Sequence, residues 1–463
     1  MKKTTQFIKF LLVVLIPISI LVSCSQSKKE KALSETQLQT KLAHPEWSKN
    51  LSIYEVNIRQ YSEEGTLKKI EESLPRLKKL GTDIIWLMPI YPIGEINRKG
   101  TLGSYYAVKN YKAINPEFGT LQDLKDLVNK AHELGMYIIL DWVANHTAWD
   151  NQLIYDHPEW YTKDSTGTII SPVPDWTDVA DLNYDNTDLR KYMINALKYW
   201  VEECNIDGYR CDVAAMVPTD FWENARNELD KIKPVFMLAE ANIPELQNKA
   251  FDMSYAWELH TLMNEIAQGK KSAIDLQEHF KKEKKKFTTN DYRMNFTSNH
   301  DENSWKGTAY KRMGDAVKTM TVFTATIPGM PLIYSGQEAC LDKQLKFFEK
   351  DVINWKNCEM DKFYSKLLSL KKENNALWNG EYGAPMTIIK TSDDKSVFAF
   401  SRINDTNKIL VVLNLSDKNA NISLLDDKAY GDYTSLFDEN NITISVEKML
   451  NLEPWDYKVY IAK

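Results

Sequence analysis

Short, fully apolar segments alternate with amphipathic segments through most of the chain. Residues 83–89 and 137–143 are apolar runs of strand length. Residues 66–80 instead carry apolar side chains at helical spacing and end before Gly81, and a second such helix is expected at 120–134. Apolar strands separated by amphipathic helices are typical of a parallel sheet that helices cover on both faces.

The same alternation continues to about residue 375. Further strands are expected at 51–59, 208–213, 235–241, 254–258, 294–299 and 331–335, with helices at 188–203 and 219–231. Eight strand–helix units fit into residues 45–376, which is the size of a (β/α)8 TIM barrel. A doubly wound open sheet is the alternative that the pattern alone leaves open.

Two regions depart from this alternation. Residues 147–185 separate the third strand from the next helix and are rich in Pro, Asp, Trp and Thr. A connection this long within a compact domain is usually functional, so we expect a short insert domain there. From residue 377 the chain turns β-rich, with apolar segments at 387–390, 397–401, 409–415 and 458–461. This pattern predicts a C-terminal antiparallel β-sandwich over 377–463.

The first residues resemble an export signal. Lys2, Lys3 and Lys9 precede an apolar run over 10–22. The run is shorter than the roughly 20 residues that span a bilayer, and its basic start matches a secretory signal peptide, expected at 1–23.

The apolar run ends in a sequence that resembles a bacterial lipobox. Leu21-Val22-Ser23 precedes Cys24, and in a lipobox that Cys carries the lipid and becomes the new N-terminus. We therefore expect a lipidated Cys24, a polar tether over 24–44 and an exported, membrane-anchored lipoprotein. An ordinary signal peptide with a chance Cys at this position is the alternative.

Composition narrows the class of partner. The chain has 58 basic and 64 acidic residues, a net charge of −6, which argues against a nucleic-acid binder because such proteins need a basic face. The remaining cysteines, Cys204, Cys211, Cys340 and Cys358, match no zinc pattern. Because Cys211 lies in an expected buried strand, we expect free buried thiols, although export would permit disulfides.

Polar residues gather at the carboxyl ends of four expected strands. They are Asp141, His146, Arg210, Asp212, Glu240, His300 and Asp301. In a barrel these strand ends meet on one face, where active sites lie. Glycoside cleavage needs such a set, with one carboxylate as nucleophile or base and one carboxylic acid that protonates the leaving oxygen.

The surroundings of each carboxylate favour a role. Arg210 lies two residues before Asp212 on the same strand face, so its charge should lower the pKa of Asp212 and keep that nucleophile ionised. Glu240 lies in an apolar segment, which should raise its pKa and suit an acid. Asp301 could hold substrate hydroxyls, and the two histidines could donate hydrogen bonds to sugar oxygens.

Residues 45–460 resemble the α-amylase family of glycoside hydrolases. Four segments carry the resemblance: Asp141-Trp-Val-Ala-Asn-His146, Gly208-Tyr-Arg-Cys-Asp212, Glu240 within Leu-Ala-Glu-Ala, and Ser298-Asn-His-Asp301. Gly103-Ser-Tyr-Tyr-Ala-Val and Asp181-Leu-Asn183 are also similar to family segments. All of them occur in the family's order along the chain.

The resemblance implies a retaining mechanism. Asp212 matches the family's nucleophile, Glu240 its acid/base and Asp301 the carboxylate that stabilises the transition state. Tyr106 aligns with the aromatic residue that stacks on the sugar beside the cleaved bond, and Arg210 with the partner of the nucleophile. The substrates implied are maltooligosaccharides or starch-like α-glucans, cleaved at α-1,4 bonds, with no cofactor required.

Two other functions remain open. A transglycosylase or isomerising relative would use the same residues and pass the glycosyl unit to a sugar. A non-catalytic, membrane-associated binding subunit would share the barrel, but the complete set of Asp212, Glu240 and Asp301 argues against it. The sequence leaves the oligomeric state open.

Calcium is a further implication of the resemblance. Many family members hold a structural Ca²⁺ between barrel and insert, and Asn145 and Asp181 can match its ligands. A further family ligand falls where this chain has Met216, whose thioether is a poor ligand for a hard cation. We therefore expect no tightly bound Ca²⁺ at this site.

Overall fold

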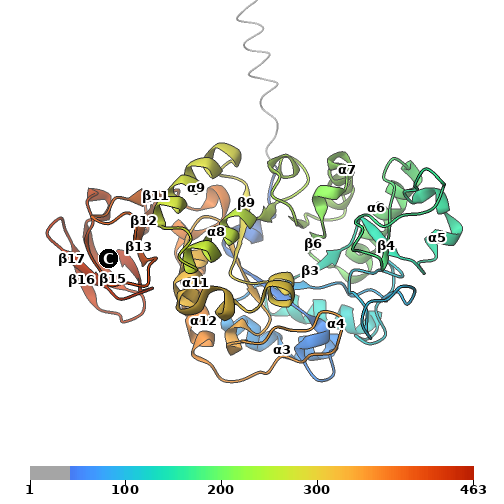
Figure 1. Ribbon diagram of the computed structural model, residues 1–463, viewed down its shortest axis with the longest axis horizontal. Coiled ribbons are helices and arrows are strands. Elements are labelled where there is room, and N and C mark those ends of the chain that lie inside the picture. Colours follow the sequence, from blue (N-terminus) through green and yellow to red (C-terminus); the bar gives the residue numbers. More distant parts are fainter. Residues whose placement is uncertain (1–41, 463) are drawn as a thin grey trace, which may run out of the picture. The chain divides into compact units, whose positions relative to one another are not determined.

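The computed structural model describes residues 42–462, which form a barrel with a small inserted sheet and a C-terminal β domain (Figure 1). The expected signal peptide, Cys24 and nearly all of the tether lie outside the described residues. Within the described part of the chain, none of the helices combines the length and apolar character that crossing a bilayer requires.

Eight parallel strands close into the barrel in the order β1-β10-β9-β8-β7-β6-β3-β2. They are β1 (Ile53–Val56), β2 (Ile84–Leu87), β3 (Tyr137–Trp142), β6 (Gly208–Cys211), β7 (Phe236–Ala239), β8 (Met253–Tyr255), β9 (Tyr292–Phe296) and β10 (Met330–Tyr334). These confirm the predicted TIM barrel and exclude the open sheet. The strands are almost entirely buried, as expected for strands packed against side chains on both faces.

Helices surround the barrel, and most of them are amphipathic, whereas α11 is almost entirely buried. The longer ones are α3 (Leu67–Leu80), α4 (Leu121–Glu133), α6 (Thr187–Cys204), α7 (Thr219–Asp230), α8 (Trp257–Ala267), α9 (Ala273–Lys286), α11 (Val317–Thr326) and α12 (Glu359–Glu373), with short helices α2 (Ile58–Tyr61), α5 (Leu153–Asp156) and α10 (Ala309–Met313). Helix α4 begins with a capping box between Thr120 and Asp123, and α3 ends at Gly81, which has φ +103°.

The first strand is shorter than its apolar pattern predicts. Residues 51–59 were expected as one strand, but β1 ends at Val56 and α2 follows at once. Arg59 is buried on this turn and donates hydrogen bonds to the backbone carbonyls of Leu102 and Gly103. The chain therefore turns at a point where the Arg59 side chain can donate hydrogen bonds to the loop that contains Leu102 and Gly103.

Strand β6, which carries Arg210, depends on a glycine at its start. Gly208 has φ +153°, and an added Cβ would lie 1.9 Å from the carbonyl oxygen of Phe236 on the neighbouring strand β7. Only glycine permits this approach of the two backbones. The strand that positions Arg210 thus starts at a residue that must be glycine.

A small antiparallel sheet lies between β3 and α6. It consists of β4 (His146–Ala148) and β5 (Val179–Asp181), which pair His146 with Asp181 and Ala148 with Val179. Helix α5 lies in the connection between them. An insert after the third strand was predicted and is confirmed; the structure shows it to be a small sheet whose first strand starts at the candidate site residue His146.

The C-terminal domain consists of a six-stranded antiparallel sheet and a two-stranded sheet. The larger sheet has the order β11-β12-β13-β18-β15-β16, and β14 pairs with β17. The strands are β11 (Met386–Ile389), β12 (Val397–Ile403), β13 (Lys408–Asn414), β14 (Ala420–Ser423), β15 (Gly431–Ser435), β16 (Asn441–Ile444), β17 (Met449–Leu452) and β18 (Tyr457–Ala462).

Alternating residues of β12 face two different cores. Phe398 and Phe400 pack against Phe323 of α11, with ring centroids 5.8 and 6.4 Å away, whereas Val397 and Ala399 belong to a core shared with β14 and β17. The two-residue period of a strand thus places one face on the barrel's helices and the other inside the domain.

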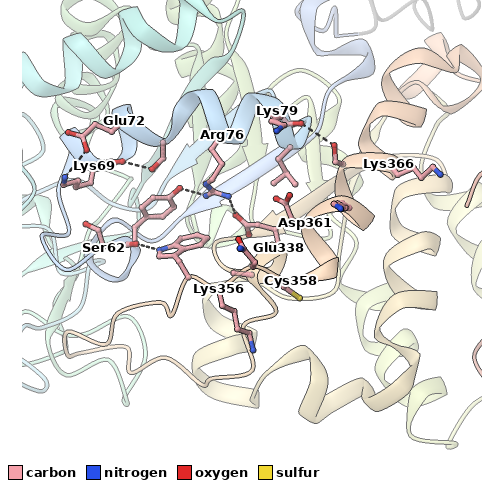
Figure 2. Close-up of a pocket in the computed structure, with 18 of the residues that line it drawn as sticks. Ser62, Lys69, Glu72, Arg76, Lys79, Glu338, Lys356, Cys358, Asp361 and Lys366 are labelled. Carbon is pink, nitrogen blue, oxygen red and sulfur yellow. Dashed lines mark hydrogen bonds and ion pairs between the residues drawn. The ribbon is translucent and has the colours of Figure 1, made fainter.

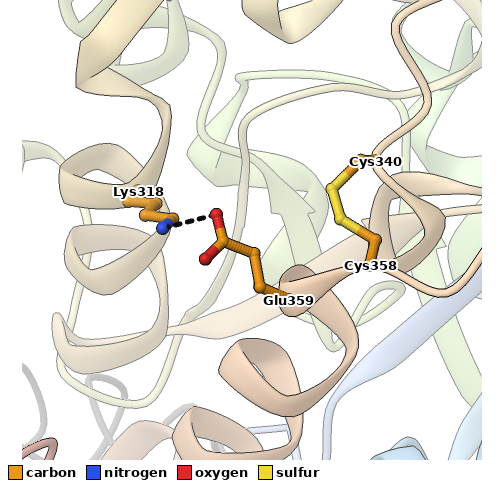
Figure 3. The surroundings of a disulfide bond; sticks show 4 residues. All are labelled: Lys318, Cys340, Cys358 and Glu359. Carbon is orange, nitrogen blue, oxygen red and sulfur yellow. Dashed lines mark ion pairs between the residues drawn. A yellow bond between two sulfur atoms is a disulfide. The ribbon is translucent and has the colours of Figure 1, made fainter.

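The cysteines correct one expectation. Cys204 and Cys211 are free and buried as expected, but Cys340 and Cys358 form a disulfide with their Cα atoms 6.0 Å apart (Figure 3). The two residues flank a long loop that returns to the start of α12, so they are neighbours in space although 18 residues apart. Sequence spacing alone does not show such a return.

Candidate active site

One buried guanidinium organises the carboxyl-terminal end of the barrel. Arg210, on β6, donates a hydrogen bond from Nη1 to Asp141 Oδ1 and another to Asp212 Oδ1, each at 2.9 Å. Its Nη2 forms an ion pair with Glu240 Oε2 at 2.9 Å. Arg210 is inaccessible to solvent. A rigid planar fork therefore fixes three carboxylates from β3, β6 and β7 relative to one another.

The second group of contacts extends from Asp141 to the next strand ends. Tyr106 donates from its hydroxyl to Asp141 Oδ2 at 3.1 Å and also lies 2.8 Å from His300 Nε2. His300 Nδ1 lies 2.5 Å from Glu55 Oε1, on β1. These buried side chains form a continuous chain of hydrogen bonds from β3 to β9 and β1.

A strained backbone position aims one donor at Glu240. Val213, directly after Asp212, has φ +36° and ψ +45°, a left-handed conformation that is unfavourable for a β-branched residue. In this conformation its backbone N–H donates to Glu240 Oε2 at 2.8 Å. Such strain persists where the surrounding structure imposes it, and it is concentrated at functional sites.

Burial raises the pKa of all three carboxyls that share Arg210. The pKa rises to about 7 for Glu240 and to about 6 for Asp212 and Asp141, because burial outweighs the opposing charge of Arg210. Glu240 has the highest pKa of the three, which agrees with the expectation that its pKa is raised. Arg210 lowers the pKa of Asp212 as expected, but burial outweighs this effect, so the expected net lowering of that pKa is wrong.

Asp301 completes the group from the side of β9. His300 Nε2 lies 3.4 Å from Asp301 Oδ2, and Trp305 donates from Nε1 to Asp301 Oδ1 at 3.1 Å. Asp301 and Glu55 together raise the pKa of His300 to about 9 against the opposing effect of burial. His300 is thus positively charged at neutral pH and faces two carboxylates.

His146 and the possible calcium ligands lie to one side. Burial lowers the pKa of His146 to about 4, and its ring meets Trp176 edge to face at 5.4 Å. Asn145 donates to Asp181 Oδ1 at 3.4 Å, a weak bond that joins β5 to the end of β3. The described residues contain no group of three or more His, Cys, Asp or Glu placed to hold a metal ion.

Four residues of the site were not predicted from the sequence. Trp86 donates to Asp141 Oδ2 at 3.1 Å, and Arg210 Nε donates to the hydroxyl of Tyr255 at 3.2 Å. Glu55 and Trp305 are the other two. Glu55 could have been found, because it is an ionisable residue within an apolar strand, whereas the two tryptophans and the tyrosine resemble ordinary core residues.

A separate cavity of about 1090 Å³ lies on the outer wall of the barrel, between α3 and α12 (Figure 2). Its lining includes six basic side chains, namely Lys69, Arg76, Lys79, Lys356, Lys362 and Lys366. The described residues that line it include none of the candidate site residues. We therefore assign the chemistry to the carboxylates around Arg210 and not to this cavity.

The chain matches two family models. "Alpha amylase, catalytic domain" matches residues 34–166 and 152–384, and "Maltogenic Amylase, C-terminal domain" matches residues 386–459. Among curated proteins, it is 27% identical to Alpha-amylase 2 of Dictyoglomus thermophilum over 452 residues, covering 87% of this chain and 75% of that protein. It is 26% identical to a cyclomaltodextrinase of Thermoanaerobacter pseudethanolicus, covering 81% and 71%.

Solved structures show the same relationship. A maltogenic α-amylase of Thermotoga neapolitana superposes with a TM-score of 0.82 at 32% identity, covering 89% of this chain and 99% of that one. An α-amylase of Lactobacillus plantarum superposes with a TM-score of 0.80 at 31% identity, covering 90% and 100%. The protein is therefore a glycosidase that belongs to the alpha-amylase family.

Proposed function

We propose that the protein hydrolyses α-1,4 bonds of maltooligosaccharides or starch-like glucans with retention of configuration. The observation that carries the proposal is the sharing of Arg210 by Asp212 and Glu240, which fixes two carboxylates at one site. The names of the relatives, α-amylases, maltogenic amylases and cyclomaltodextrinases, support α-glucans as the substrate class.

In this mechanism each carboxylate has a defined role, and Glu240 acts first as an acid and then as a base. Asp212 attacks the anomeric carbon and displaces the leaving oxygen, which takes a proton from Glu240. Glu240, with a pKa of about 7, is partly protonated at neutral pH and can supply that proton. Glu240 then removes a proton from the water that releases the glycosyl unit from Asp212. Asp301 holds sugar hydroxyls, and Tyr106 stacks on the sugar beside the bond.

Product analysis tests this function. Wild type incubated with maltoheptaose should give only shorter sugars, whereas longer sugars would identify a transglycosylase. Asp212→Asn should lose several orders of magnitude in kcat, and Asp432→Asn, at an exposed position of β15 in the C-terminal domain, should retain full activity. Wild-type kcat in Asp212→Asn would overturn the proposed mechanism.

We also propose that the protein is exported and held at a membrane by a lipid on Cys24. The disulfide between Cys340 and Cys358 supports export, because disulfides persist in oxidising compartments. Cys24→Ser should abolish lipid labelling and release the protein from the membrane fraction. Unchanged membrane fractionation would contradict the proposal.

We propose further that no Ca²⁺ is needed at Asn145 and Asp181. Burial raises the pKa of Asp181, and the two side chains already bond to one another. A further ligand position of the family holds Met216, whose thioether is a poor ligand for a hard cation. The Tm of metal-stripped protein should not rise when Ca²⁺ is added, and a rise that Asn145→Ala removes would contradict this.

A further inference from the structure

A tryptophan lies exposed beside the catalytic group. Trp305 belongs to a π-helical turn, η5 (Glu302–Lys306), that begins immediately after Asp301. Its side chain is 51% exposed, although large apolar side chains in this chain are mostly buried. Short π-helical turns are rare and frequently occur at functional sites. The turn therefore places an indole where a bound ligand could reach it.

The indole N–H of Trp305 has a defined partner. It donates to Asp301 Oδ1 at 3.1 Å, while His300 Nε2 faces the other carboxylate oxygen at 3.4 Å. The Asp301 side chain remains 36% exposed, so without these two neighbours it would be free to rotate. Trp305 thus fixes one oxygen of Asp301 and leaves the carboxylate open towards the solvent.

The ring of Trp305 continues an aromatic row. Its centroid lies 5.0 Å from that of Phe347 and 5.7 Å from that of Phe348. Phe347 is in turn 6.3 Å from Tyr106, with the two ring planes only 14° apart. Trp305, Phe347 and Phe348 also line one open pocket of about 400 Å³. The row runs from the sugar-stacking candidate Tyr106 outward along the site.

The π-helical turn and the phenylalanine loop are joined by hydrogen bonds. Asn303 donates from its side chain to the carbonyl of Lys343 at 3.1 Å and accepts from the N–H of Leu345 at 2.9 Å. Gln344 donates to the carbonyl of Ser304 at 2.7 Å. The disulfide between Cys340 and Cys358 closes the loop at its base. The aromatic row is therefore built on a cross-linked support.

We propose that Trp305 has two functions: its N–H holds Asp301 in place, and its ring, with Phe347 and Phe348, binds a second glucose unit of the substrate. Aromatic faces suit the apolar faces of sugar rings, and sugar hydroxyls suit the polar side chains that line the same pocket, namely Ser304, Gln344, Lys346 and Glu349. The inference rests on the proposed function and adds a second binding position to it.

Two substitutions separate the two functions of Trp305. Trp305→Phe retains an aromatic ring and removes the N–H, so kcat on maltoheptaose should fall about tenfold with little change in KM. Trp305→Ala removes both, so KM should in addition rise about tenfold. Phe348→Ala should raise KM for maltoheptaose and leave kcat nearly unchanged.

The control is an exposed aromatic residue at the other end of the barrel. Tyr382 lies near Lys49, a residue that precedes β1 in the chain. Tyr382→Ala should leave both kcat and KM unchanged. Binding of maltoheptaose, measured by calorimetry with Asp212→Asn in the background, should weaken with Trp305→Ala and not with Trp305→Phe. If Trp305→Ala does not fold, the other two variants still test both functions.

The outcomes distinguish this inference from the proposed function. A wild type that cleaves no α-glucan would overturn the proposed function. An active wild type whose kcat and KM are unchanged in Trp305→Ala would overturn the inference alone. A loss of kcat in Trp305→Ala that Trp305→Phe restores would refute the role of the N–H.

Discussion

Buried carboxylates at the two ends of the barrel differ in how many basic side chains each of them contacts. At the amino-terminal end, three aspartates precede strands β2, β6 and β8, and each has two basic partners. The sets are Asp83 with Lys78 and Lys372, Asp207 with His132 and Lys233, and Asp252 with His44 and Arg226. At the carboxyl-terminal end, one guanidinium, Arg210, serves three carboxylates.

The difference in partners separates Asp252 from the three carboxylates around Arg210 in the direction of the pKa shift. Although burial raises the pKa of Asp252, Arg226 and His44 outweigh it and the pKa is lowered. Burial raises the pKa of Glu240, Asp212 and Asp141 because a shared Arg210 does not outweigh it. An excess of cations thus favours the ionised form and the fold, whereas an excess of carboxylates keeps protons available for transfer.

Opposite pH dependences of stability follow. Glu240 has a pKa near 4.3 when unfolded and about 7 when folded, so its ionisation destabilises the fold as the pH rises through that range. Asp252 has a lowered pKa when folded, so it stabilises the fold above its unfolded pKa, near 3.9, and this stability is lost as the pH falls. The comparison can be tested at both ends.

The largest expected effect is that of Glu240→Gln. With maltoheptaose, kcat should fall by about 10²–10⁴-fold, because the leaving oxygen loses its proton donor. With α-glucosyl fluoride, whose leaving group needs no proton, the loss should be much smaller. Because the ionised carboxylate is removed, the free energy of unfolding at pH 8 should rise. Equal losses of kcat on both substrates would show that Glu240 is not the acid.

Asp252→Asn should affect stability instead of catalysis. It leaves the buried Arg226 without its main partner, so the free energy of unfolding should fall by about 3–5 kcal/mol in urea denaturation at pH 7. The kcat per folded molecule should be unchanged. Asp230→Asn is the matched control: Asp230 pairs with the same Arg226 but is 39% exposed, and its loss should cost less than about 1 kcal/mol.

The disulfide, near the carboxyl-terminal end of the barrel, should contribute less to the free energy of unfolding than the pairing of Asp252 with Arg226. Replacing both Cys340 and Cys358 by Ser should lower the free energy of unfolding by about 3 kcal/mol, because the bond closes a loop between residues 18 apart. Wild type in dithiothreitol should show the same lowered Tm as the double variant. A reductant that leaves the wild-type Tm unchanged would contradict this.

The smallest expected effect concerns Glu55. Glu55→Gln removes one of the two carboxylates that raise the pKa of His300 to about 9, so that pKa should fall. The titration profile of the His300 imidazole, followed by NMR, should then move to lower pH by about one unit, and kcat at pH 6 should change less than tenfold. Glu46→Gln, at the opposite end, should leave the profile unchanged.

The sequence predicted the barrel well because its strands are continuously apolar. The ends of those strands also identified the carboxylates that the structure brings together around Arg210. Strands β14 to β17 were missed, since they are short and partly exposed, with little apolar pattern. The helical turn after β1 was missed because Ile58 continues the apolar pattern of the strand.

What the sequence could not provide depends on distances between remote residues. The pairing of Glu55 with His300 joins positions 245 residues apart, and the disulfide depends on how the loop after β10 returns. The pKa of Asp212 depends on its burial and on the neighbouring carboxylates Asp141 and Asp301, which a spacing of two residues from Arg210 does not reveal. The contact of Trp305 with Asp301 depends on a π-helical turn that no pattern predicted.

The central claim is that Asp212, in the carboxylate-rich end of the barrel, is the nucleophile. The direct test is to trap the covalent intermediate with a 5-fluoro-α-glucosyl fluoride and to map the label by peptide mass spectrometry. The account predicts one glucosyl label on the peptide that contains Asp212, and none in Asp212→Asn. A label on another residue, or none on an active wild type that releases the β-anomer first, would contradict it.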